Sequence, residues 1–156
     1  MYTPLTPSRA LPACRWPLRA AELREAMELL FFSYRAFTRG PDRMLEKRGL
    51  NRVHHRILYF VARQPGLSVN DLLSVLDVSK QALHVPLRQL VAMKLVQNDK
   101  SKLDGRVREL RLTAAGKRLE ARLSGTQQLQ LQSVFAEAGR DAEKAWRKTM
   151  RLLARD

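Results

Sequence analysis

The sequence lacks three features that would indicate a secreted or membrane-bound protein. It has a single cysteine, Cys14, so it cannot build an internal disulfide framework. Its longest apolar runs, such as residues 29–32, are far shorter than the roughly 18 residues that a membrane-spanning helix needs. Prolines at positions 4, 7, 12 and 17 interrupt the N-terminus, so we expect no signal peptide. These absences favour a cytoplasmic protein.

Acidic residues are also scarce. The 156 residues include 15 Asp and Glu against 29 Lys and Arg, which gives a formal net charge of +14 and a sequence pI near 11.0. A charge this large on a small chain repels itself, so it usually indicates an anionic partner. Nucleic acid is the first candidate, and an acidic membrane surface is the second.

The sequence also has no recognisable catalytic or metal-binding motif. It contains no G-x-x-x-x-G-K-S/T loop, no H-E-x-x-H, no G-x-S-x-G and no paired carboxylates in apolar surroundings. His54 and His55 are adjacent, and neighbouring helical residues point about 100° apart, so they do not chelate one ion together. We therefore expect neither an enzyme nor a cofactor.

Apolar residues at three- and four-residue steps predict helices at both ends of the chain, after an extended arm over residues 1–17. Gly40-Pro41 is expected to interrupt the first helix. Thr113 is expected to cap a long helix that ends at Gly139, and a last helix covers residues 141–154. The N-terminal stripe consists of Leu23, Met27, Leu30, Phe31, Tyr34 and Phe37, and the C-terminal helices contribute Leu129, Phe135 and Trp146.

Residues 68–93 have the spacing of a helix-turn-helix. Ser68 and Ser79 are N-cap residues of two helices joined by a short turn. The second helix places Leu83, Leu87, Leu90 and Val91 on one side. Its other side presents Gln81, His84 and Arg88, with Lys80 at the start, and these side chains suit the edges and phosphates of a major groove. The alternative is an ordinary solvated helix face.

The next segment predicts a hairpin with a cationic tip. Residues 95–99 and 106–112 form the strands, because Leu110 and Leu112 alternate with charged residues. Asp104-Gly105 predicts the turn, and Asp104 is positioned to hold the Arg106 guanidinium. The cations of the tip are Lys100, Lys102, Arg106 and Arg108. Such a ribbon can lie along DNA and insert an arginine into the minor groove; the alternative is a charged loop.

These segments resemble the MarR family of bacterial transcriptional regulators. The resemblance rests on LSVNDLLSVLDVSKQALHVPLRQLVAMKLV, on the D-x-R pattern of residues 104–106 and on the L-T-x-x-G pattern of residues 112–116. It covers residues 18–156 and implies a mainly α fold with a small β-hairpin wing (α+β). The implied organisation is an arm (1–17), an N-terminal dimerisation helix region (18–48), a winged helix-turn-helix DNA-binding domain (49–112) and C-terminal dimerisation helices (113–156).

The resemblance implies a homodimer that binds a pseudo-palindromic operator in double-stranded DNA. Recognition helices would enter successive major grooves and wing arginines the flanking minor grooves. The base-contacting candidates carried over are Gln81, Ala82 and His84. Pro86 departs from a regular helix, because it removes the hydrogen bond to the Ala82 carbonyl; the helix is expected to kink there or to begin later. The terminal apolar stripes would form the dimer, although they could also pack within one chain.

Two further sites follow only from the family. Many members repress transcription and release DNA when a small aromatic effector binds, which suggests a pocket at Tyr34, His54 and His55. Packing and solvent contacts are the simpler interpretation of the two histidines. Some relatives sense oxidants through an N-terminal cysteine, a role that Cys14 could have beside Arg15, although a lone cysteine in an arm is more often inert.

The leading hypothesis is a dimeric, sequence-specific DNA-binding repressor, located in the cytoplasm at the nucleoid. Two alternatives remain open. One is a winged helix used for protein interaction, which the charge of +14 disfavours. The other is a nonspecific architectural DNA-binding protein, which would share the charge but show no preference for one sequence.

Overall fold

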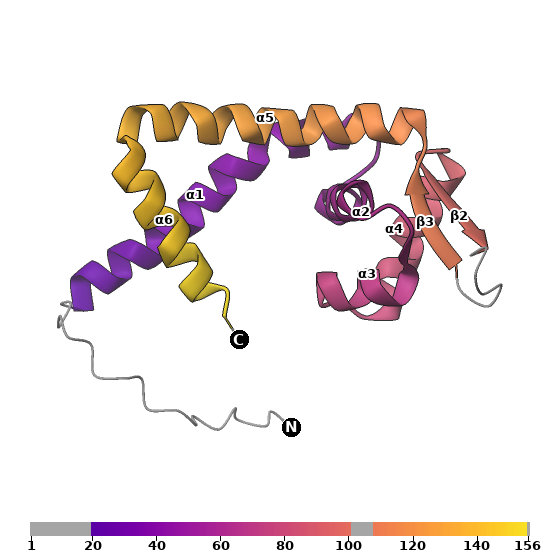
Figure 1. Ribbon diagram of the computed structural model, residues 1–156, viewed down its shortest axis with the longest axis horizontal. Coiled ribbons are helices and arrows are strands. Elements are labelled where there is room, and N and C mark those ends of the chain that lie inside the picture. The colour runs from indigo at the N-terminus through magenta and orange to yellow at the C-terminus, as the bar shows by residue number, and fades with distance from the viewer. Residues whose placement is uncertain (1–19, 101–107, 156) are drawn as a thin grey trace, which may run out of the picture. The chain divides into compact units, whose positions relative to one another are not determined.

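The computed structural model describes residues 20–100 and 108–155 (Figure 1). The chain divides into two compact units, residues 1–35 and 36–156. Helix α1 (Ala20–Glu46) begins in the first unit and ends in the second. In the first unit, the described residues 20–35 are all exposed. Phe31 and Phe32 contact each other edge to face, with ring centroids 5.4 Å apart.

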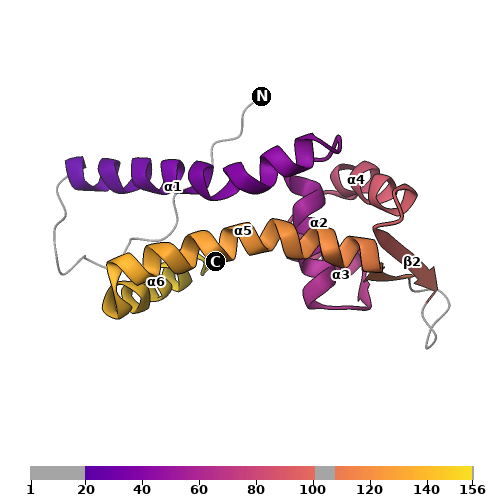
Figure 2. The ribbon, with the colours of Figure 1, turned by 90° about the horizontal axis from the view of Figure 1, so that it is seen from above.

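The second unit combines helices with a small antiparallel sheet of order β1-β3-β2. Strand β2 of this sheet lies next to α4 (Figure 2). This confirms the predicted fold class, a mainly α winged helix-turn-helix. The prediction of a two-stranded hairpin was incomplete, because β1 adds a third strand that pairs Leu67 with Leu110. The remaining elements are α2 (Arg52–Arg63), β1 (Leu67–Ser68), α3 (Val69–Leu76), α4 (Lys80–Ala92), β2 (Val96–Lys100), β3 (Arg108–Leu112), α5 (Ala114–Ala138) and α6 (Arg140–Leu153).

The core of this unit lies where α2, α3, α4, the sheet and the start of α5 meet. Leu110 and Leu112 point into it, as the alternation along β3 predicted. Val75 of α3 is 46% exposed. The buried apolar residues include Ile57, Leu58, Val61, Leu72, Leu83, Leu90, Val96, Leu119 and Leu123.

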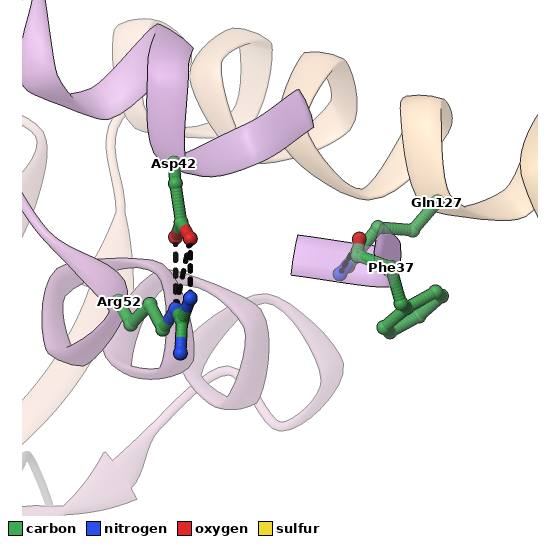
Figure 3. A network of polar contacts seen from close by, with 4 residues as sticks. All are labelled: Phe37, Asp42, Arg52 and Gln127. Atoms are coloured by element: carbon green, nitrogen blue, oxygen red, sulfur yellow. Dashed lines mark hydrogen bonds and ion pairs between the residues drawn. The ribbon is translucent and has the colours of Figure 1, made fainter. Parts of the chain in front are cut away.

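Helix α1 continues through Gly40-Pro41, so the predicted interruption was wrong. Proline has no N–H to donate to the carbonyl four residues earlier, here that of Phe37. Gln127 of α5 replaces that donor, since its Nε2 lies 3.2 Å from the Phe37 carbonyl oxygen (Figure 3). Near this point the Arg52 guanidinium donates to both carboxylate oxygens of Asp42, at 2.7–3.1 Å.

Helices α2, α3 and α4 begin at side-chain caps, as predicted for the two that Ser68 and Ser79 cap. Asn51 and Ser68 each form a capping box. The side chain of the cap residue accepts a hydrogen bond from a backbone N–H of the third helical residue, and the side chain of that residue accepts one from the backbone N–H of the cap. Ser79 Oγ accepts from the Ala82 N–H at 3.2 Å. Gly139 ends α5 with φ 89°, in the region that favours glycine.

The L-T-x-x-G segment fixes the sheet to the start of α5. Thr113 Oγ1 accepts from the Gly116 N–H at 3.0 Å and donates to the Lys94 carbonyl at 2.7 Å. The Thr113 N–H donates to the Leu95 carbonyl at 3.1 Å. Gly116 packs so closely on Leu95 that a Cβ on residue 116 would overlap the Leu95 carbonyl oxygen. Glycine is therefore required here by close packing of the backbone.

Replacing Gly116 by alanine tests this packing. We expect Gly116→Ala to lower the free energy of unfolding by about 1–3 kcal/mol, because backbone atoms must move apart. Gly125→Ala is the matched control in the same helix, since nothing lies within 4 Å of its Cβ position. It should stabilise the protein by about 0.5–1 kcal/mol. Urea denaturation of both variants makes the comparison, and equal effects would contradict the close packing at Leu95.

Candidate nucleic-acid interface

A short turn sets the direction of α4 relative to α3. Asp77 ends α3 in the left-handed conformation, with φ 48° and ψ 51°. Ser79 then caps α4, so the helix begins at Lys80. Pro86 lies within a helix that runs on to Ala92, so the expectation of a later start was wrong.

The two sides of α4 differ in burial. Leu83, Leu87 and Leu90 are buried in the core. Val91, predicted to lie with them, is 36% exposed. The candidate DNA-contacting residues of α4 all lie exposed: Lys80, Gln81, Ala82, His84 and Arg88. The exposed side of α4 therefore presents donors and cations to solvent between Lys80 and Arg88, beginning at an N-terminus that favours anions.

The hairpin adds positive charge next to this helix in the sequence. Lys100 of β2 lies directly opposite Arg108 of β3, and both are exposed. Arg108 Nη1 donates to the Asn98 carbonyl at 3.0 Å, which holds its guanidinium at the base of the hairpin. Like charges directly opposite each other destabilise a strand pair, so an anion between them would relieve a repulsion. Lys102, Asp104 and Arg106 lie outside the described residues.

His54 links α2 to α4 through a chain of hydrogen bonds. Its Nδ1 accepts from the Asn51 N–H at 3.1 Å, and its Nε2 donates to Gln89 Oε1 at 3.1 Å. Gln89 Nε2 donates in turn to the Gly49 carbonyl at 3.1 Å. His54 is 3% exposed, and this burial lowers its pKa from 6.5 despite the hydrogen bonds, which act to raise it. The neutral ring therefore joins the start of α2 to the recognition helix.

His55 of α2 lies half-buried against α5. Its Nε2 is 3.5 Å from Ser124 Oγ, and Ser124 donates to the Glu120 carboxylate. Burial lowers the pKa of His55 below 6.5, while the charges of Glu120 and Asp42 act in the opposite direction. Tyr34, the third candidate pocket residue, belongs to the first unit.

Other predicted features fall outside these sites. Cys14 lies outside the described residues. Within residues 20–100 and 108–155, no three His, Cys, Asp or Glu side chains form a group that could hold a metal ion. In the same part of the chain, no helix is both long enough and apolar enough to cross a membrane.

Sequence reasoning missed Gln89 and Val85 on α4. Gln89 bonds to a histidine 35 residues away in the sequence, so no local pattern indicates its role. Val85 is 67% exposed on a helix whose apolar residues were expected to face the core. Helical spacing from the leucines would have placed Val85 outward.

The capped helix pair and the three-stranded sheet define a winged helix-turn-helix protein. A model of the MarR family matches residues 48–107. The HTH-type transcriptional regulator PetP of Rhodobacter capsulatus is 40% identical over 129 residues, which cover 83% of this chain and 78% of that protein. The chain belongs to the MarR family of transcriptional regulators. This kinship also confirms the prediction that it is not an enzyme.

Solved structures share the fold. Staphylococcus aureus MarR in complex with salicylate and kanamycin matches with a TM-score of 0.71 and 20% identity, over 86% of this chain and 91% of that one. A mutant of S. aureus MepR bound to an oligodeoxyribonucleotide matches with a TM-score of 0.59 and 18% identity, over 82% and 94% of the two chains. At these identities the likeness extends to the fold alone.

The lowered pKa values of His54 and His55 make stability depend on pH. Between the folded-state pKa and 6.5 the unfolded chain binds more protons, so the free energy of unfolding should fall as pH drops through 6.5. Urea denaturation between about pH 7.5 and about pH 5.5 measures this slope. It should be shallower in His54→Gln and in His55→Gln. An unchanged slope in the His54→Gln, His55→Gln double variant would contradict the assignment.

Proposed function

We propose that the protein is a dimeric, sequence-specific DNA-binding repressor. The observation that supports this most strongly is the division of α4 into a buried leucine side and an exposed polar side, next in sequence to a cationic hairpin. A formal charge of +14 supplies long-range attraction to DNA. The oligodeoxyribonucleotide in the MepR complex is consistent with the same use of this fold. A protein acting on chromosomal DNA would work in the cytoplasm, at the nucleoid.

Dimerisation is proposed from apolar side chains that one chain leaves uncovered. Helix α6 has no buried residue. The rings of Phe135 on α5 and Trp146 on α6 pack edge to face, with their centroids 5.4 Å apart. A surface this apolar is typical of an interface. The exposed apolar residues include Leu23, Met27, Phe31, Leu129, Trp146 and Leu153. A second copy of the chain would cover them and repeat the DNA-binding surface one helical turn away.

Selection of genomic DNA fragments by the purified protein, followed by gel shifts, tests this proposal. We expect an inverted repeat, and a fall in affinity of about three to five decades between about 50 and 200 mM salt if the dimer contacts about six to ten phosphates. Arg88→Ala should weaken operator binding about fivefold or more, because one guanidinium contact is worth about 1–3 kcal/mol. Lys144→Ala on α6 also removes one exposed charge and should keep the operator preference.

The outcomes separate the three hypotheses. Binding whose affinity falls as salt rises, but that shows no preference over competitor DNA, would identify an architectural protein instead. A dimer that shifts no DNA at low salt would identify a protein-interaction module. Either result overturns the repressor proposal.

We also propose that a small aromatic carboxylate releases the DNA. The support is His55, which lies half-buried beside Ser124 and Glu120, together with the salicylate bound by S. aureus MarR. His54 and His55, both on α2, are the proposed pocket residues.

Titration of the protein–operator complex with salicylate tests the ligand, with acetate as the non-aromatic control. We expect salicylate alone to release DNA with a saturable dose dependence. His55→Gln should raise the required concentration about tenfold, by about 1.4 kcal/mol. The same dose dependence in wild type and variant, or release by acetate as well, would contradict a site at His55.

A further inference from the structure

Val85 points outward from α4. Residues two apart on a helix lie about 200° apart around its axis. Val85 is two residues from both Leu83 and Leu87, which are buried, so it points away from the core. Its side chain is 67% exposed. Gln81 lies one turn before it and Arg88 one turn after it, so an apolar side chain occupies the middle of the polar face.

A valine is costly at this position. It is β-branched, which lowers helix propensity, and an alanine would favour the helix more. It also precedes Pro86, whose ring disfavours the helical conformation of the preceding residue. Burial of the side chain offsets neither cost, because the side chain is exposed. A contact made outside the free chain would account for the residue.

We propose that Val85 contacts the C5 methyl group of a pyrimidine in the major groove, between the base pairs that Gln81 and Arg88 contact. The inference rests on the proposed DNA binding and extends it to a determinant of specificity. The major groove displays only one apolar group on its natural bases, the thymine methyl, and an aliphatic side chain is the chemical match for it. 5-Methylcytosine presents the same group from another base.

Removing single methyl groups from the operator tests this contact. Each thymine of the selected operator is replaced in turn by deoxyuridine, which differs only by the methyl group. Wild-type protein should lose affinity about fourfold at one thymine position in each half-site, the value expected for one buried methyl group. Val85→Ala should bind the unmodified operator more weakly and should lose the sensitivity at that position.

A second series distinguishes the two sources of the methyl group. With cytosine at the sensitive position, methylation at C5 should raise the affinity of the wild-type protein about fourfold and leave that of Val85→Ala unchanged. Val75→Ala is the matched control, since Val75 is a 46%-exposed valine on α3; it should keep the full response to deoxyuridine.

The results separate this contact from DNA binding itself. If binding is sequence-specific but no deoxyuridine substitution lowers the affinity, the Val85 contact is overturned and the repressor proposal stands. An equal deoxyuridine penalty in wild type and Val85→Ala would have the same meaning. Absence of any selected sequence would overturn both. A melting temperature of Val85→Ala at or above that of wild type establishes that its folding is intact.

Discussion

Burial of three leucines on one side of α4 is the constraint on which the proposed function depends. Leu83, Leu87 and Leu90 lie in the core, so the rotation of the helix about its axis is fixed. The exposed side then has no alternative but to present Gln81, Val85 and Arg88 to solvent together. The hydrogen bonds from His54 to Gln89 and from Gln89 to Gly49 hold the flank of the same helix against α2. Packing and polar bonds thus position one surface.

A second constraint joins this surface to the long helix α5. Thr113 caps α5 and bonds to Lys94, while Gly116 packs against the backbone of Leu95. The two contacts fix where the sheet leaves the core and where α5 begins. This arrangement gives a physical meaning to the L-T-x-x-G pattern, whose threonine and glycine have separate roles.

Local signals in the sequence predicted most of the fold. Caps at Asn51, Ser68, Ser79 and Thr113 depend on side chains within three residues, so they are visible in the sequence. Features that depend on distant partners were missed. Helix α1 continues through Pro41 because Gln127 supplies a donor 90 residues from Phe37, and β1 is two residues long and has no periodicity of its own. At the candidate site, the exposed polar side of α4 was predicted, whereas Gln89 and Val85 were not.

The exposed side of α4 is proposed to enter a major groove. Methylation interference on the selected operator tests it most directly, because dimethyl sulfate modifies guanine N7 in the major groove and adenine N3 in the minor groove. We expect guanine methylation to block binding in two segments about 10 base pairs apart, one for each recognition helix of the dimer. Interference confined to adenine N3, with every guanine N7 tolerant of methylation, would contradict the account.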